Sequence, residues 1–139
     1  MRGLPGVCVR VEYLSRKAEE AGLERDSVQR TVELELRKAG IKVLSEEEWK
    51  NTSGFPHLHI TLGTSYQEND SLVGFAVTVE LKQHVVLARD ASKECIAVTW
   101  RTLSAGSVGA GNIDLIRTGA LVEDLEIFLN DWFTVNPKE

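Results

Sequence analysis

The chain has 139 residues, of which 42% are hydrophobic and 27% charged, so it has the size and balance of one globular domain spanning residues 1–139. Its net charge of −5 and its lack of any long basic cluster argue against nucleic-acid binding, which needs clustered Lys and Arg to neutralise phosphates. No run of 18 apolar residues is present, so we expect no integral membrane segment.

The first half of the chain predicts a strand, a helix and a second strand. Apolar and polar residues alternate over residues 7–13, which is the pattern of a half-buried strand. Apolar residues then recur at helical spacing over residues 28–39, and Gly40 stands where a left-handed helix cap belongs. The short apolar run 41–44 predicts a second strand, which a right-handed crossover would place parallel to the first.

The second half predicts an antiparallel meander followed by a helix. We expect strands over residues 57–63 and 75–87, joined by a turn at residues 67–71, with a bulge at Gln83. A further strand is expected over residues 96–100, and the C-terminal segment has the apolar periodicity of an amphipathic helix.

These elements predict an α+β fold, in which two main helices lie on one face of a five-stranded mixed sheet. The arrangement is a two-layer sandwich with the order β-α-β-β-β-β-α. The expected core consists of apolar residues from these elements and the three tryptophans: Val9, Val11, Leu36, Leu62, Val77, Val79, Val98, Ile116, Leu125, Phe128, Trp49, Trp100 and Trp132. The other sheet face is expected to be polar: Arg10, Glu12, His57, His59, Thr61, Thr78, Glu80, Lys82, His84, Thr99 and Arg101.

Three histidines on the polar face are the candidates for a metal site. His57 and His59 point to one side of a strand, and His84 lies further along the same face. The expected hairpin register places Glu80 opposite His59 and Lys82 opposite His57. A lysine among the ligands and a flat sheet argue against a metal ion, and the alternative is that these are ordinary polar strand residues. We therefore predict no metal and no cofactor.

The glycine-rich segment 106–111, from Gly106 to Gly111, is the candidate for a phosphate-binding loop. It lies between a predicted strand and a predicted helix, where such loops occur. It matches neither G-x-G-x-x-G nor the P-loop pattern, and it lacks the P-loop lysine. The favoured interpretation is a mobile connection.

The polar face is comparatively basic for an acidic protein. Most acidic residues lie on the predicted helices, whereas this face carries Arg10, Lys82 and Arg101. We predict these three as the partner-binding residues, which would meet an acidic protein partner or the acidic helices of a second copy. The alternative is a solvated sheet face without a partner.

The two cysteines, Cys8 and Cys95, lack the spacing of a zinc or redox motif. Strand parity places both on the polar face. If their strands are neighbours, the pair would form a disulfide in an oxidising compartment. The alternative is that both thiols are free.

Three segments resemble those of small exported bacterial proteins of uncharacterised function: residues 36–49, 79–83 and 131–137. In such proteins a signal peptide precedes the equivalent of Arg2. The element order is similar, more distantly, to that of the curli-secretion lipoprotein and of the amino-terminal domain of the Tol-system propeller protein. The resemblance implies an exported domain that binds other proteins and has no catalytic residues.

We therefore expect an exported domain, periplasmic or secreted, that is not an enzyme and that binds a protein partner or self-associates. The alternative is a small-molecule, phosphate or metal-binding protein, conceivably an enzyme, and the alternative location is the cytoplasm. A cleft with convergent polar groups would favour that alternative. An open sheet edge completed by another chain would favour the first expectation.

Overall fold

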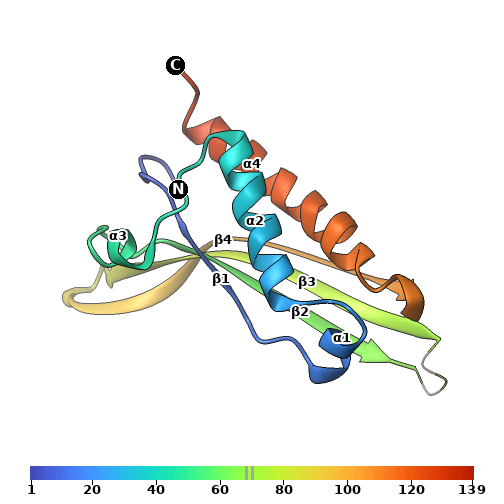
Figure 1. The fold of residues 1–139 in the computed structure, drawn as a ribbon. Coiled ribbons are helices and arrows are strands. Elements are labelled where there is room, and N and C mark those ends of the chain that lie inside the picture. The colour runs from blue at the N-terminus through green and yellow to red at the C-terminus, as the bar shows by residue number, and fades with distance from the viewer. Residues whose placement is uncertain (68, 70) are drawn as a thin grey trace.

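The computed structural model describes residues 1–67, 69 and 71–139, and its α+β fold is built on one mixed sheet (Figure 1). Four strands of the described chain lie in the order β1-β2-β3-β4: β1 (Cys8–Val11), β2 (His57–Tyr66), β3 (Leu72–Leu87) and β4 (Asp90–Gly109). β1 runs parallel to β2, and the other two pairings are antiparallel. β1 and β4 are therefore the edges of the sheet.

The second strand predicted over residues 41–44 does not form. Only Val43 pairs with Val7, as an isolated parallel bridge held by Val7 N to Lys42 O at 3.0 Å and Leu44 N to Val7 O at 2.8 Å. The pairing stops there because the chain enters a helix directly afterwards and side chains of the preceding helix bond the next carbonyl groups of β1. The sheet has four strands where the sequence predicts five.

Two long helices, α2 (Arg25–Ala39) and α4 (Val122–Val135), lie side by side over one face of the sheet (Figure 1). α2 contacts β1, and α4 contacts β3 and β4. Shorter helices lie around them: α1 (Arg16–Glu20), α3 (Glu46–Lys50), the 3₁₀ turn η1 (Ala110–Asn112) and the π-helical turn η2 (Ile116–Leu121). None of the helices in the described part of the chain is long and apolar enough to cross a bilayer.

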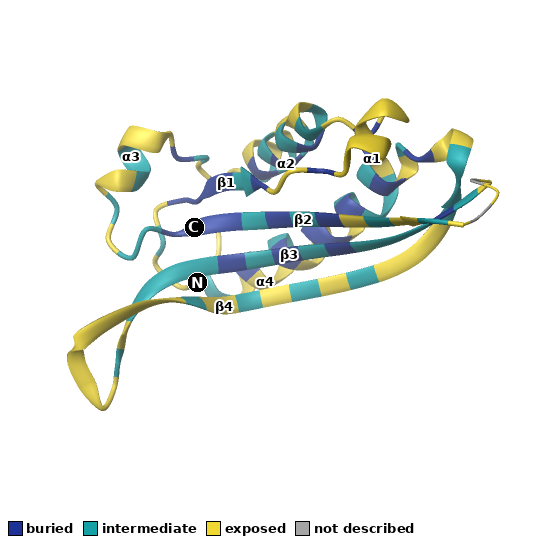
Figure 2. Ribbon diagram, turned by 90° about the horizontal axis from the view of Figure 1, so that it is seen from below, coloured by how far each residue is buried: buried dark blue, intermediate teal, exposed yellow. Residues whose placement is uncertain are grey.

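The core lies between the sheet and the two long helices, and burial extends along β1, β2 and β3, while β4 is more exposed (Figure 2). Nine of the ten aliphatic and phenylalanine residues predicted for the core are buried, and Val98 is not, at 46% exposed. Trp100 and Val98 pair with two consecutive residues of β3, so Thr99 is the extra residue of a β-bulge. Side chains that alternate regularly before the bulge therefore point to the opposite sheet face after it. The predicted bulge at Gln83 is therefore on the wrong strand.

The predicted register of the β2–β3 hairpin is confirmed, because His57 pairs with Lys82 and His59 pairs with Glu80. The turn predicted at residues 67–71 includes residues 68 and 70, which lie outside the described residues.

The glycine-rich segment is not a loop. Gly106 and Gly109 lie inside β4, opposite Phe75 and Leu72, and η1 follows at once. A Cβ atom at Gly106 would lie 3.0 Å from Cζ of Phe75, so glycine allows the aromatic ring to lie over the neighbouring strand. Residues 106–109 of the segment pair with β3, so the prediction that the segment is a mobile loop is wrong.

Candidate functional site

The face of the sheet that the two long helices leave uncovered, which we call the outer face, carries the three predicted partner-binding residues. Paired residues of neighbouring strands point to the same face, and the register aligns Arg10, His59, Glu80 and Arg101 in one row across the four strands. Lys82 lies in the next row. Arg10 and Arg101 are therefore on opposite edges of this face, with Lys82 between them.

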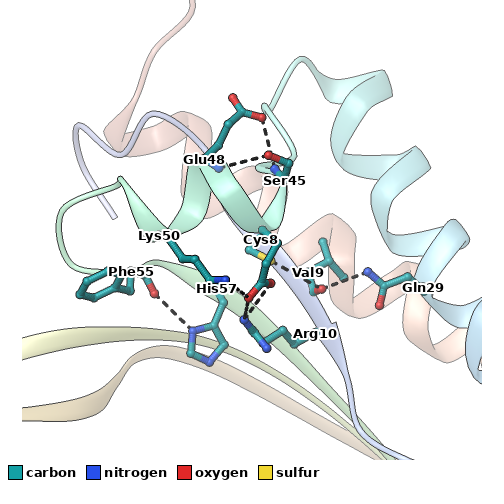
Figure 3. A network of polar contacts seen from close by, with 10 residues as sticks. Cys8, Val9, Arg10, Gln29, Ser45, Glu48, Lys50, Phe55 and His57 are labelled. Carbon is teal, nitrogen blue, oxygen red and sulfur yellow. Dashed lines mark hydrogen bonds and ion pairs between the residues drawn. The ribbon is translucent and has the colours of Figure 1, made fainter.

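Contacts with β1 hold the one-turn helix α3 over one end of the outer face (Figure 3). A capping box starts the helix, with Glu48 N donating to Ser45 Oγ at 3.1 Å and Ser45 N donating to Glu48 Oε1 at 3.3 Å. Lys42 forms an ion pair with Glu48, and Arg10 of β1 forms one with Glu46 at 3.2 Å.

The sequence predicts Trp49 in the core, but α3 places it beside the outer face. The guanidinium carbon of Arg10 lies 4.4 Å from its ring centroid, and the rings of Phe55 and His57 meet it edge-on at 5.5 and 6.2 Å. Its Nε1 is buried and has no hydrogen-bond partner among the described residues. A single helical turn beyond the sheet edge cannot deliver a side chain to the other face, and this is why apolar character alone misplaces Trp49.

These residues surround a hollow of about 340 Å³ on the outer face, which we call the outer-face hollow. It is lined by two cations, three histidines, an indole and one aliphatic side chain: Arg10, Lys82, His57, His59, His84, Trp49 and Ile96. Phe55 supports it from behind, with its ring 4.8 Å from that of His84. Sequence reasoning identified the cations and histidines but missed Trp49, Phe55 and Ile96.

His57 is the most buried polar residue of the hollow, at 7% exposed. Burial lowers the pKa of this imidazole; the hydrogen bond to the Phe55 carbonyl opposes this in part, and the nearby positive charges of Arg10 and Lys82 lower the pKa further. Nδ1 of His57 lies 3.3 Å from that carbonyl oxygen, so in the neutral ring Nδ1 carries the hydrogen. The ring is therefore neutral at pH 7 and adds no positive charge to the hollow.

The three histidines have separate partners. Within the described residues no group of three His, Cys, Asp or Glu side chains is arranged to hold a metal ion. Nε2 of His59 lies 2.9 Å from Glu12 Oε1, the ring of His84 packs on Phe55, and His57 faces a backbone carbonyl. The candidate metal ligands thus share a face without converging on one point.

The two cysteines are not neighbours. Cys8 lies on β1 and Cys95 on β4, the opposite edges of the sheet, and both are free. Cys8 is buried and burial raises its thiol pKa, whereas Cys95 is exposed. The condition for a disulfide, that their strands be adjacent, is not met.

The outer edge of β4 is a second feature of interest. Ala110 N donates to Ser71 O at 3.0 Å. In an antiparallel ladder every second residue hydrogen-bonds the same neighbouring strand, so the backbone groups of the even-numbered residues from 100 to 108 point toward β3. The backbone N–H and C=O groups of residues 101, 103, 105 and 107 therefore point away from the sheet. Within the described chain no strand pairs with this edge, although β4 is 20 residues long.

Apolar side chains accompany this open edge both on the sheet and on α4. On the sheet, Leu103 is 65% exposed and Ile96 is 59% exposed. On α4, Ile127 is 47% exposed. Ile127 is three residues after Asp124 and four before Asp131, so the three share one side of the helix.

That side of α4 faces β4. Asp124 accepts a hydrogen bond from Ser104 Oγ, and Asp131 accepts one from Trp100 Nε1, both at 2.7 Å and both from β4 residues. Ile127 therefore projects at the same edge of the molecule as Leu103.

The outward carbonyl groups of β1 are hydrogen-bonded by contrast. Gln29 Nε2 donates to Val9 O at 3.0 Å, and Arg25 Nε donates to Val11 O at 2.8 Å, both from α2. The bridge between Val7 and Val43 occupies the start of the same edge. β1 is also only four residues long, so it offers little backbone to another strand.

Comparison with known proteins adds no assignment. A scan against protein-family models matches none of them, and a search of curated proteins finds no significant match.

Proposed function

We propose that this is a non-enzymatic assembly domain that pairs with a second copy of itself along the open edge of β4. The observation that carries the proposal is the asymmetry of the two sheet edges. β4 presents unpaired backbone groups over residues 101–107 beside exposed apolar side chains, whereas the carbonyl groups of β1 are bonded by Gln29 and Arg25. Proteins commonly protect edge strands with short length, charges or covering segments.

The pairing would be antiparallel about a two-fold axis near Leu103. In that arrangement identical edges meet, as in most homodimers, and Leu103 lies opposite its own symmetry mate. Between residues 97 and 109 the one charged residue is Arg101, which would lie opposite Ala105 of the other copy, so no like charges oppose one another there. The result would be one continuous sheet through both copies.

A second copy is favoured over an isolated extended peptide because apolar side chains are exposed in both layers at this edge. A peptide strand would cover the sheet residue Leu103 and leave Ile127 of α4 in water. A second copy brings its own α4 to the same edge, so Ile127 would lie near its symmetry mate. This extends the interface beyond strand pairing alone, as a stable dimer of about 1,200 Å² or more requires.

Export to the periplasm or the medium is part of the proposal, and the resemblance to small exported proteins is its support. The geometry supports a non-enzymatic role because the polar side chains of the outer face are engaged mainly with one another. Arg10 with Glu46 and His59 with Glu12 are such pairs.

The test is the oligomeric state measured by sedimentation velocity over a range of concentrations. We expect a reversible dimer for the wild-type chain and a monomer for Leu103→Lys, because two ammonium groups would meet at the axis. Ala105→Pro removes an outward-facing N–H without touching the β3 ladder and should also weaken the dimer. Leu34→Lys is the matched control, since Leu34 is 50% exposed on α2, and it should not change the dimer.

A wild-type chain that stays monomeric at its highest soluble concentration would overturn the proposal. So would a dimer that Leu103→Lys leaves intact while circular dichroism shows the variant to be folded.

A further inference from the structure

The outer-face hollow combines features that point to a ligand rather than to a solvated surface. None of the residues that line it is a carboxylate, although the chain has 21 acidic residues and only 16 basic ones. Its charged lining consists of Arg10 and Lys82. Its other walls are rings and one aliphatic side chain, with Trp49 contributed by α3 and Ile96 by β4.

The positive groups of the hollow are held in place with part of their bonding capacity unused. Arg10 is fixed by stacking on Trp49 and by one carboxylate, Glu46, which its Nη2 atom meets at 3.2 Å. A guanidinium has five N–H donors, so this pairing leaves donors for a further acceptor. Nζ of Lys82 lies 3.9 Å from Glu80 Oε2, which is beyond hydrogen-bond distance, so the ammonium group is attracted to Glu80 without donating to it.

The apolar walls are equally well positioned. The ring of Trp49 is fixed from three sides by Arg10, Phe55 and His57, so it cannot swing freely. The rings of His57 and His59 lie next to each other, with centroids 6.0 Å apart. These rings meet at steep angles and so present both faces and edges to the hollow, which suits an aromatic ligand, because aromatic rings interact most favourably edge-to-face or offset-stacked.

We infer that the outer-face hollow binds a small aromatic carboxylate, with the carboxylate on Arg10 and Lys82 and the ring against Trp49. The hollow's volume of about 340 Å³ lies at the small end of the range for ligand pockets, which suits a single ring with one acidic group. The neutral His57 forms part of the wall, and Ile96 closes the side toward β4. Leu103, at the centre of the proposed dimer, does not line the hollow, so this inference stands apart from the proposed function.

The test uses benzoate as the probe, followed by the indole N–H signal of Trp49 in ¹H–¹⁵N spectra and by calorimetry. Benzyl alcohol is the matched uncharged probe and inorganic phosphate the matched anion without a ring. We expect saturable benzoate binding with a shift of the Trp49 signal, and binding at least tenfold weaker for each of the other two probes.

Lys82→Gln and Trp49→Leu should each weaken benzoate binding tenfold or more. Arg101→Gln is the control, because Arg101 is a cation of the same face that does not line the hollow, and it should change the affinity less than twofold. Lys82→Gln keeps the inference testable if Trp49→Leu disturbs α3. Absence of saturable binding, equal binding of benzyl alcohol or phosphate, or an unchanged affinity in Lys82→Gln would each overturn the inference.

Discussion

Replacing Phe128 by Ala tests the packing of α4 on the sheet. The side chain is fully buried and touches two further aromatic rings, Trp100 at a centroid distance of 5.1 Å and Trp132 at 5.8 Å. Truncating a buried Phe to Ala costs about 3–5 kcal/mol, because transfer free energy is lost and a cavity remains. Since domains of this size are stable by about 5–15 kcal/mol, the change removes a large part of the total.

The expected shift in melting temperature follows from chain length. An unfolding entropy of about 2.1 cal/mol/K per residue makes 1 kcal/mol equivalent to roughly 3 °C in a chain of this length. Phe128→Ala should therefore melt about 10–17 °C below the wild type, measured by calorimetry or circular dichroism.

Ile127→Ala is the matched control for this measurement. Ile127 is the adjacent residue of α4 and is 47% exposed, and Ala is a better helix former, so the monomer should lose little stability. The comparison belongs at a concentration where both chains are monomeric. If Phe128→Ala melts within 3 °C of the wild type, the assigned buried face of α4 is wrong. The same holds if Ile127→Ala lowers the melting temperature as much as Phe128→Ala does.

Three further predictions follow from single residues. Burial raises the pKa of Asp124, so this carboxyl ionises first in the unfolded state, and the stability of the wild type falls as the pH rises from about 4 toward the higher folded pKa. Asp124→Asn should therefore melt above the wild type at pH 7. A difference in melting temperature between the two chains that does not shrink toward pH 3 would contradict this. Gly40→Ala places a side chain at φ +90 and should cost about 1 kcal/mol in urea unfolding, whereas no loss would contradict the left-handed cap. In the native protein one thiol, Cys95, should react quickly with a thiol reagent and Cys8 only on unfolding; two fast thiols would contradict the burial of Cys8.

Much of the fold is predictable from periodicity. Alternation over residues 57–62 and 75–81 correctly predicts which side of each strand is buried, and a hairpin centred near Asn69 gives the register. The parity prediction fails at Val98 because the bulge at Thr99 is a backbone event that side-chain alternation does not reveal. The short strand predicted over residues 41–44 has the right neighbour, but its pairing stops after one bridge because the chain enters α3 and side chains of α2 bond the next carbonyl groups of β1.

The candidate site divides in the same way. Arg10, Lys82 and the histidines are found from the sequence because strand parity places them on one face. Trp49 is not found from the sequence, because its position depends on a capping box and on ion pairs that hold α3 beside β1. The open edge of β4 is also invisible in the sequence, since which strand lies at an edge is decided by the topology of the whole sheet.

The covered edge of β1 limits how far the proposed pairing can extend. A sheet with two open edges can add copies indefinitely, as fibrils do, whereas the proposed pairing would use one open edge of each copy. Once the β4 edges of two copies are joined, the side chains of Gln29 and Arg25 close both remaining edges against a third copy. In the proposed dimer, the two α2 residues that bond the carbonyl groups of β1 would therefore limit the assembly to two copies.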